Sequence, residues 1–197
     1  MYGISSMIQL GKKVWKLNVD SNVYIIDCGE KVVVDCGPRA YFVDVKKELS
    51  SVVNLEEIKK VILTHIHYDH CGNVDLFPNT TIYAHKDEIT DFKKMPSIAF
   101  SLPFPIITLL KLKLTDIAEI ADFLKKNNIE IIEVPGHTKG SIALIHSKEK
   151  ILFSGDCLFE NGIGRYDLPN SVPAKMEKSL AKLKKLDYKI LAPGHDY

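Results

Sequence analysis

Short apolar, β-branched runs alternate with turn-forming residues along the first third of the chain. Runs of this length, bounded by glycine, asparagine and aspartate, are typical of short β-strands. A helix is predicted next, over Tyr41–Leu49, because its apolar residues recur at helical spacing. The strands predicted in this first part are Val14–Leu17, Val23–Ile26 and Val32–Asp35.

The rest of the chain repeats these two patterns. Asp116–Asn127 starts with an aspartate and has a glutamate three residues later, which is the signature of a capped helix N-terminus. Lys175–Leu186 has its apolar residues on one face, as an amphipathic helix does. Strands and helices in this order indicate sheets covered by helices in one α/β domain over residues 1–197. The further predicted strands are Val61–Leu63, Thr81–Ala84, Ile129–Val134, Ile142–Ile145, Ile151–Phe153 and Lys189–Leu191.

Composition excludes several classes of protein. The chain has 26 basic and 25 acidic residues and a formal net charge of +1, whereas nucleic-acid binders usually carry a basic stripe. It has no run of about 18 apolar residues, so we expect no membrane span. Its start lacks the features of a secretory signal, and its four cysteines form no Cys-x-x-Cys pair. We therefore expect a cytoplasmic monomer or homodimer that acts on a small molecule and binds neither nucleic acid nor membrane.

Residues 64–73 have the sequence THIHYDHCGN and follow a predicted strand. His65 and His67 are two residues apart, so they project from the same face if the strand continues. Asp69 and His70 follow where the chain must turn, and Gly72 permits that turn. Imidazole and carboxylate side chains spaced this tightly suit zinc, iron or manganese.

Three more predicted strands run into a glycine-bearing turn that ends in a possible metal ligand. The three ligand candidates are His137, Asp156 and His195. Active sites of sheet proteins collect at strand ends, and together these residues are enough for two metals. The remaining histidines, His85 and His146, are interpreted as an ordinary strand-end residue and a surface residue.

The motifs THIHYDH, PGHTKGS, SGDCLF and PGH, in this order, resemble the metallo-β-lactamase superfamily, and most closely its glyoxalase II-like (hydroxyacylglutathione hydrolase-like) hydrolases. The resemblance implies a four-layer αββα sandwich with the site at one edge of the two sheets. It also implies a first metal held by His65, His67 and His137. The second metal would be held by Asp69, His70 and His195, with Asp156 bridging the two and Asp35 supporting the ligand loop.

Two divalent metals in such a site, zinc before iron or manganese, hold a bridging hydroxide that attacks the substrate. The resemblance therefore implies hydrolysis of a small thioester or ester-like bond, with Asp69 as the catalytic residue that orients the hydroxide. In true β-lactamases a cysteine can be a ligand at the position of Asp156, so the aspartate weighs against β-lactam hydrolysis.

Residues 162–169, GIGRYDLP, resemble the GRxDLP segment of single-domain glyoxalase II-like proteins and the GRxD of persulfide dioxygenases. Arginine is rare in this lysine-dominated chain, which indicates that position 165 requires the planar guanidinium group and not only a positive charge. Arg165 binds a substrate carboxylate or pairs with Asp167 to fix the loop, and we favour the pairing because the two residues are so close in sequence.

Several alternatives follow from the same residues. A persulfide dioxygenase with a single iron is the main one, and a lactonase or a phosphodiesterase is less favoured. The sequence ends two residues after His195, without the helical domain that binds glutathione in classical glyoxalase II, which makes that thioester a less expected substrate. The uncharged run Pro96–Leu110 is expected to pack on the core, to line the pocket or to form a dimer patch.

Overall fold

Two β-sheets form the centre of the fold. The computed structural model of the chain describes residues 6–96 and 113–197. In this part, the first sheet has seven strands in sequence order: β1 (Ile8–Gly11), β2 (Val14–Asn18), β3 (Asn22–Asp27), β4 (Lys31–Val34), β5 (Lys60–Ile62), β6 (Thr81–Ala84) and β7 (Leu114–Asp116). The second sheet has four strands in the order β11-β10-β9-β8: β8 (Ile129–Glu133), β9 (Ile142–His146), β10 (Ile151–Gly155) and β11 (Ile190–Pro193).

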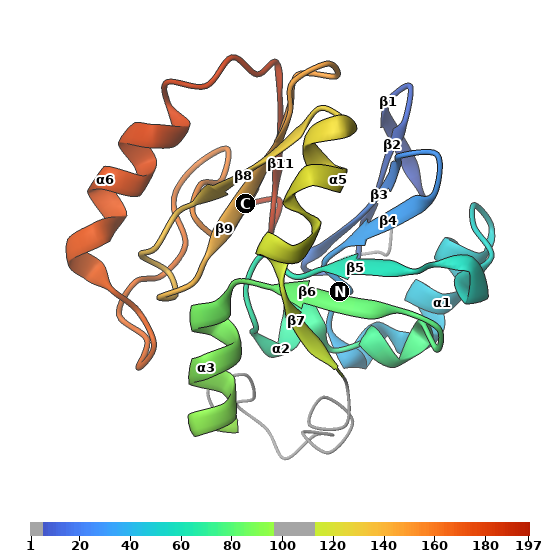
Figure 1. Cartoon of the computed structure of the whole chain (residues 1–197), viewed down its shortest axis with the longest axis horizontal. Coiled ribbons are helices and arrows are strands. Elements are labelled where there is room, and N and C mark those ends of the chain that lie inside the picture. Colours follow the sequence, from blue (N-terminus) through green and yellow to red (C-terminus); the bar gives the residue numbers. More distant parts are fainter. Residues whose placement is uncertain (1–5, 97–112) are drawn as a thin grey trace.

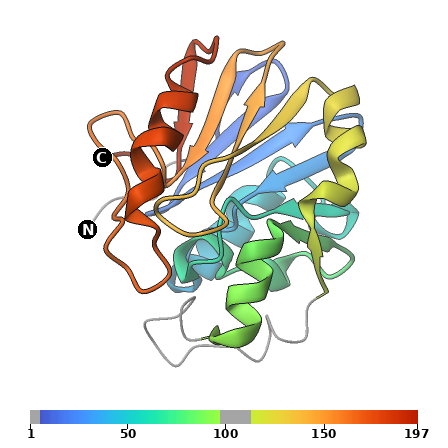
Figure 2. The ribbon, with the colours of Figure 1, turned by 60° about the vertical axis from the view of Figure 1, so that its left-hand side comes forward.

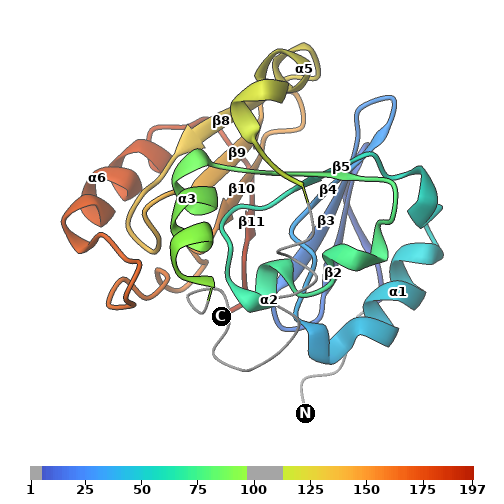
Figure 3. The same ribbon diagram turned by 60° about the horizontal axis from the view of Figure 1, so that its bottom comes forward.

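Helices cover the outer faces of both sheets (Figure 1). Figure 3 shows α6, the second sheet, the first sheet and α1 in succession across the molecule. In Figure 2, α5 (yellow) lies on the side of the molecule away from α6 (red). This is the predicted αββα sandwich. The helices are α1 (Phe42–Ser50), α2 (Tyr68–Cys71), α3 (Lys86–Lys94), α5 (Ala121–Lys126) and α6 (Pro173–Leu183).

The four layers follow from alternation of side chains along the strands. In β3, Val23 and Ile25 pack toward α1 and α3, whereas Tyr24 and Ile26 pack toward the second sheet. In β10, Phe153 faces the first sheet and forms an edge-to-face ring contact with Tyr24, with centroids 5.1 Å apart. Leu152 faces α6 instead. Strands buried on both faces therefore appear in the sequence as continuous apolar runs.

Strand direction brings the ends of several strands to one edge. The strands β1 to β4 pair antiparallel, whereas β4, β5, β6 and β7 pair parallel. In the second sheet β8, β9 and β10 are antiparallel, and β11 is parallel to β10. Parallel strands have their carboxyl ends on the same side, and loops that follow those ends commonly build binding sites.

Some predicted elements need correction. The strands β1 and β7 are not predicted, because β1 contains polar and glycine residues and β7 is only three residues long. The helix predicted at Asp116–Asn127 begins as a 3₁₀ turn, Ile117–Ile120, although the Asp116 side chain caps it as expected by accepting from the Ala118 N–H. The run Pro96–Leu110 lies outside the described residues apart from Pro96. Within the described ranges, no helix is long and apolar enough to cross a membrane.

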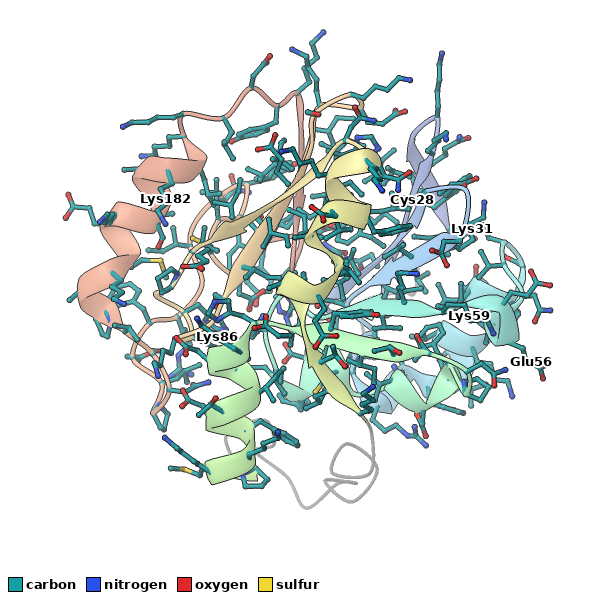
Figure 4. All side chains as sticks on the ribbon, in the orientation of Figure 1. Cys28, Lys31, Glu56, Lys59, Lys86 and Lys182 are labelled. Atoms are coloured by element: carbon teal, nitrogen blue, oxygen red, sulfur yellow. The ribbon has the colours of Figure 1, made fainter. Side chains whose placement is uncertain are left out.

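Lysine side chains lie on the outside of the molecule (Figure 4), and some of them bond to backbone groups of neighbouring elements. Figure 4 shows Lys31 and Lys59 on the first-sheet side of the molecule and Lys182 on α6. The Lys182 Nζ donates to the carbonyl oxygen of Glu133, 2.8 Å away, and so links α6 to the end of β8.

Candidate metal centre

Five loops that follow strand ends meet at one edge of the sandwich. Asp35 follows β4, and His65 and His67 follow β5. The remaining ligand candidates lie in α2, after β8, after β10 and after β11: Asp69, His70, His137, Asp156 and His195. The strand β5 ends at Ile62, so the two histidines lie in an irregular segment and not on one strand face as predicted. Asp69 and His70 lie in the short helix α2, where the sequence had indicated only a turn.

The first group consists of three buried imidazoles, from His65, His67 and His137. The His137 Nε2 atom lies 3.2 Å from the Nε2 of His65 and 2.9 Å from the Nδ1 of His67. Asp156 borders this group, with its Oδ2 3.5 Å from the His137 Nε2. Three ring nitrogens aimed at one point form a donor set of the kind that zinc and iron take. We call this set the three-histidine group.

The second group combines carboxylates with imidazoles. The Asp69 Oδ2 lies 3.2 Å from the Nε2 of His195 and 3.6 Å from the Nε2 of His70. Asp156 reaches the same two rings, with its Oδ1 3.3 Å from His70 Nε2 and its Oδ2 3.6 Å from His195 Nε2. We call Asp69, His70 and His195 the carboxylate-rich group, because Asp69 and the neighbouring Asp156 place two carboxylates against its two rings. Asp156 lies between the two groups and contacts both.

Two buried atoms in the centre lack a hydrogen-bond partner, and this supports a cation site. They are the Nε2 of His70 and the Oδ1 of Asp156. His70 already uses its Nδ1 in a 2.9 Å contact with the Asp35 carboxylate, which makes Nδ1 the protonated ring nitrogen. Its Nε2 faces carboxylate oxygens of Asp156 and Asp69 at 3.3–3.6 Å, and these favour a proton on it while no metal is bound. A divalent metal held by these residues would take the place of that proton and satisfy both atoms, so the residues present fit the metal that the donor set implies.

The histidine ring nitrogens that face away from the centre contact carbonyl or hydroxyl oxygens of the protein. The Nδ1 of His137 donates to the carbonyl of Arg165, 2.6 Å away, and the Nδ1 of His195 donates to the carbonyl of Asp20 at 2.9 Å. The Nδ1 of His65 lies 3.1 Å from the Thr64 hydroxyl. Such contacts fix the tautomer and the direction of each ring, as is usual for histidines that bind metals.

Asp35 supports the loop that carries the first histidines. Its Oδ1 accepts from the Thr64 N–H and its Oδ2 accepts from the Thr64 hydroxyl, both at 2.8 Å. Its φ is +55°, a left-handed backbone conformation that non-glycine residues seldom adopt. The same Oδ2 contacts His70, so one buried carboxylate orients both the loop and a ligand ring.

The loop that carries His195 is held by the residue after it. The Asp196 carboxylate accepts from Lys16 Nζ at 2.6 Å and from Asn22 Nδ2 at 2.8 Å, both on the first sheet. The Tyr24 hydroxyl donates to the carbonyl of Pro193 in the same loop, at 2.7 Å. The loop of the candidate ligand His195 follows a strand of the second sheet and is thus held by residues of the first.

Close packing around Asp156 requires glycine at Gly194. A Cβ at Gly194 would collide with the Oδ1 of Asp156 and would lie 2.9 Å from the Cε1 of His70. Gly155, which ends β10, has φ +51°, a conformation that favours glycine. The glycines in the Ser-Gly-Asp and Pro-Gly-His turns therefore allow Thr64, Asp156 and His70 to lie close to the backbone, in addition to allowing the chain to turn.

The two groups differ in their protonation chemistry. Burial lowers the pKa of His65 well below its usual range and, helped by the neighbouring His137, lowers the pKa of His67 to about 4. These rings are therefore neutral donors. Burial opposes charge on His70, but Asp156 and Asp69 outweigh it and raise its pKa well above the usual range. Burial likewise raises the pKa of Asp69, and the nearby His70 and His195 outweigh it and lower that pKa.

A cavity of about 530 Å³ opens onto these ligands. Its walls include Phe159, Ile163 and Leu168, with Tyr68 and Tyr197 at the rim. The ring of Tyr197 stacks on that of His195, with centroids 5.0 Å apart. A cavity of this volume is of the size that small-molecule sites have.

Arg165 and Asp167, the predicted substrate or loop-fixing residues, form an exposed fork. The Arg165 Nε lies 3.0 Å from Asp167 Oδ1, and its second nitrogen lies 3.2 Å from Oδ2. Both side chains are 70% exposed. Arg165 lines the cavity, and its backbone carbonyl, not its side chain, contacts His137.

Sequence reasoning missed several residues around the centre. Asn170 lies 3.4 Å from the Nε2 of His67 through its Oδ1, and Glu88 lies behind the ligand loops. Neither carries a sequence signal for such a role. His85 caps α3 by accepting from the Asp87 N–H. His146, interpreted as a surface residue, is buried at the end of β9, because this strand is covered on both faces.

Comparison with known proteins agrees with this architecture. The family model described as the metallo-beta-lactamase superfamily matches residues 18–195. A probable metallo-hydrolase of Methanocaldococcus jannaschii is 29% identical over 192 residues, which cover 92% of each chain. A hydroxyacylglutathione hydrolase of Haemophilus influenzae is 34% identical over 125 residues, 57% of this chain and 55% of that protein.

The fold also resembles solved structures. A protein crystallised in a di-iron-bound form superimposes with a TM-score of 0.66 at 24% identity, over 90% of this chain and 88% of the other. At this identity the likeness concerns the fold. The family model covers the five loops that carry the ligand candidates, and the four layers agree with it. The chain belongs to the metallo-beta-lactamase superfamily.

Proposed function

We propose that the chain is a metal-dependent hydrolase with a dinuclear site that cleaves a small thioester or ester-like substrate. The observation that carries the proposal is the convergence of two donor groups on Asp156, whose buried carboxylate oxygens lie 3.3–3.6 Å from ring nitrogens of both groups. The two groups together supply a separate donor set for each of two metals. The resemblance to hydroxyacylglutathione hydrolases supports the thioester side of the proposal.

The ligands divide between two metals. The three-histidine group would hold the first, the carboxylate-rich group would hold the second, and Asp156 would contribute to both. Bound divalent metals supply Lewis-acid chemistry, in which they polarise a carbonyl and acidify water. We propose zinc, because imidazole and carboxylate donors suit it, with iron and manganese as the alternatives.

The protein residues orient the reacting groups. Asp69 lines the cavity, its carboxylate is kept ionised by His70 and His195, and it is placed to accept a hydrogen bond from a water. In this role Asp69 holds the attacking water in line with the scissile carbonyl. The apolar walls exclude bulk water from one side of the substrate, which strengthens these interactions. No serine or cysteine nucleophile is required.

Metal analysis combined with a substrate panel tests the proposal. The protein is purified, its metal content is measured by mass spectrometry, and hydrolysis of thioesters, esters and lactones is assayed with and without a chelator. We expect two metals per chain and thioester or ester hydrolysis that the chelator abolishes. An inert protein with one metal or none would contradict the proposal.

The main alternative is a mononuclear iron persulfide dioxygenase, which the Gly-Arg-x-Asp segment at Arg165 suggests. Oxygen uptake with glutathione persulfide, by protein expressed with added iron, separates the two functions. Oxygen uptake together with one iron per chain favours the dioxygenase. The absence of both, with hydrolysis present, favours the dinuclear hydrolase.

A further inference from the structure

A carboxylate outside both donor groups lies directly behind them. Glu88 is in the first turn of α3 and is 4% exposed. Figure 4 labels Lys86 at the first residue of this helix. Glutamate is almost never buried to this degree unless its oxygens have partners. The partners of Glu88 therefore indicate what it does.

The two oxygens of Glu88 accept hydrogen bonds from two different ligand loops. The Oε2 accepts from the backbone N–H of Ile66 at 2.8 Å, and the Oε1 accepts from the N–H of Gly140 at 2.9 Å. Ile66 separates the first two histidines of the three-histidine group, and Gly140 follows the third by three residues. One side chain thus joins a loop of the first sheet to a loop of the second.

The second loop is fitted closely against the start of α3. A Cβ at Gly140 would lie 2.7 Å from the backbone nitrogen of Glu88 and 2.9 Å from its Cγ. Within this loop the Thr138 N–H donates to the Ser141 hydroxyl at 3.0 Å, and the two hydroxyls of these residues lie 2.7 Å apart. The hydrogen bond from the Gly140 N–H and this close packing therefore hold residues 138–141 against the start of α3.

We propose that Glu88 is a positioning residue that holds the three-histidine group together across the seam between the two sheets. The histidines of the two loops reach 2.9–3.2 Å from one another. Distances this short between ligand nitrogens depend on how the two loops are placed relative to each other, and Glu88 bonds to both. This role rests on the proposed metal binding.

The substitution Glu88→Gln tests the role with little change in volume. The amide has one oxygen, so one of the two loop N–H groups loses its acceptor and faces an NH₂ group. Metal-free protein is titrated with Co²⁺, whose absorption spectrum reports the donor set, and unfolding of the metal-free protein by urea is measured separately. We expect affinity at the three-histidine group to fall about 10–100-fold, as for other residues that orient ligands, with a smaller fall at the carboxylate-rich group.

Ile89→Ala is the matched control. Ile89 is the next residue of α3, is 8% exposed and packs in the apolar core, so its loss weakens the helix without touching the bridge. If both variants lose stability equally, only Glu88→Gln is expected to change the Co²⁺ affinity and spectrum. Equal losses of affinity in the two variants would overturn the positioning role.

Other outcomes are equally decisive. Wild-type affinity and spectrum in a folded Glu88→Gln variant would overturn the role while leaving the proposed hydrolase intact. A wild-type protein that binds no metal would overturn both. If Glu88→Gln does not fold, Gly140→Ala tests the bridge from its other end, because the added methyl group pushes the loop from α3. The same selective loss of affinity is expected, and unchanged affinity would contradict the proposal.

Discussion

The three-histidine group and the carboxylate-rich group lie side by side, share Asp156, and are held in different ways. In the first, burial lowers the pKa values of His65 and His67, and the three imidazole rings contact one another. In the second, Asp156 and Asp69 outweigh burial and raise the pKa of His70, while His70 and His195 outweigh burial and lower that of Asp69. The first group is therefore a set of packed imidazoles, and the second places carboxylates against imidazoles.

Most supporting contacts follow this division, but one residue spans it. The Arg165 carbonyl and the Glu88 bridge place loops of the first group, whereas the Asp20 carbonyl and the Asp196 carboxylate place His195 in the second. Asp35 contacts both the Thr64 segment and His70. The comparison teaches that one site can combine two solutions to the same problem of holding ligands in position before a metal arrives. Substitutions in one set of contacts should then affect one group more than the other.

Removal of a ligand should have the largest effect. His67→Ala deletes a donor from the three-histidine group and is expected to lower metal content from two per chain to one and activity by at least about 100-fold, because losing a ligand costs more than losing an outer partner. Metal analysis and the hydrolysis assay measure both. His146→Gln, a buried histidine outside the centre, is the control. Full activity with one metal would refute the two-group account.

The next largest effect is expected for Asp35→Asn. The amide has one oxygen in place of two, so the contacts to Thr64 and to His70 cannot all be kept. Affinity should fall about 10–100-fold at the carboxylate-rich group, through His70, and also at the three-histidine group, through the Thr64 segment. Titration with Co²⁺ measures the two affinities. Asp27→Asn, which alters another strand-end aspartate, should change neither, and wild-type affinity at both groups in Asp35→Asn would contradict the supporting role of Asp35.

A smaller effect is expected for Asp196→Ala. This change removes the acceptor for Lys16 and Asn22 and frees the loop that carries His195. The carboxylate is partly exposed, so the loss in stability should be only about 1 kcal/mol after solvent screening. The predicted signature is weaker metal binding at the carboxylate-rich group alone. Asp187→Ala, which breaks an exposed pair with Lys150, serves as the control.

The smallest effect is expected for Arg165→Ala. The fork with Asp167 is exposed, and the contact to His137 is made by the backbone carbonyl, which the substitution keeps. Urea unfolding and metal content should match the wild-type protein. A clear loss of metal from the three-histidine group would show that the side chain, and not only the backbone, positions His137.

The convergence of the candidate ligands could be predicted because these residues are dense and chemically distinctive. His65, His67, Asp69 and His70 lie within six residues, and the other candidates each follow a strand and a glycine. Their convergence did not depend on the assumed strand through His65 and His67, which the structure replaces by an irregular segment. Position at the carboxyl ends of strands was sufficient.

The supporting contacts could not be predicted for physical reasons. An acidic residue in the first turn of a helix ordinarily interacts with the helix dipole and solvent, so Glu88 has no signal that distinguishes it. The contacts to His137 and His195 come from the carbonyl groups of Arg165 and Asp20, which every residue possesses. The strands β1 and β7 escaped prediction because they lack an apolar run.

The central claim is that two metals bind per chain, one at each group, with Asp156 common to both. Calorimetric titration of the metal-free protein with Zn²⁺, repeated on Asp156→Asn, tests it most directly. The account predicts two equivalents bound by the wild-type protein and weakened binding of both in the variant. A single equivalent in the wild-type protein, or a variant that binds two as tightly, would contradict it.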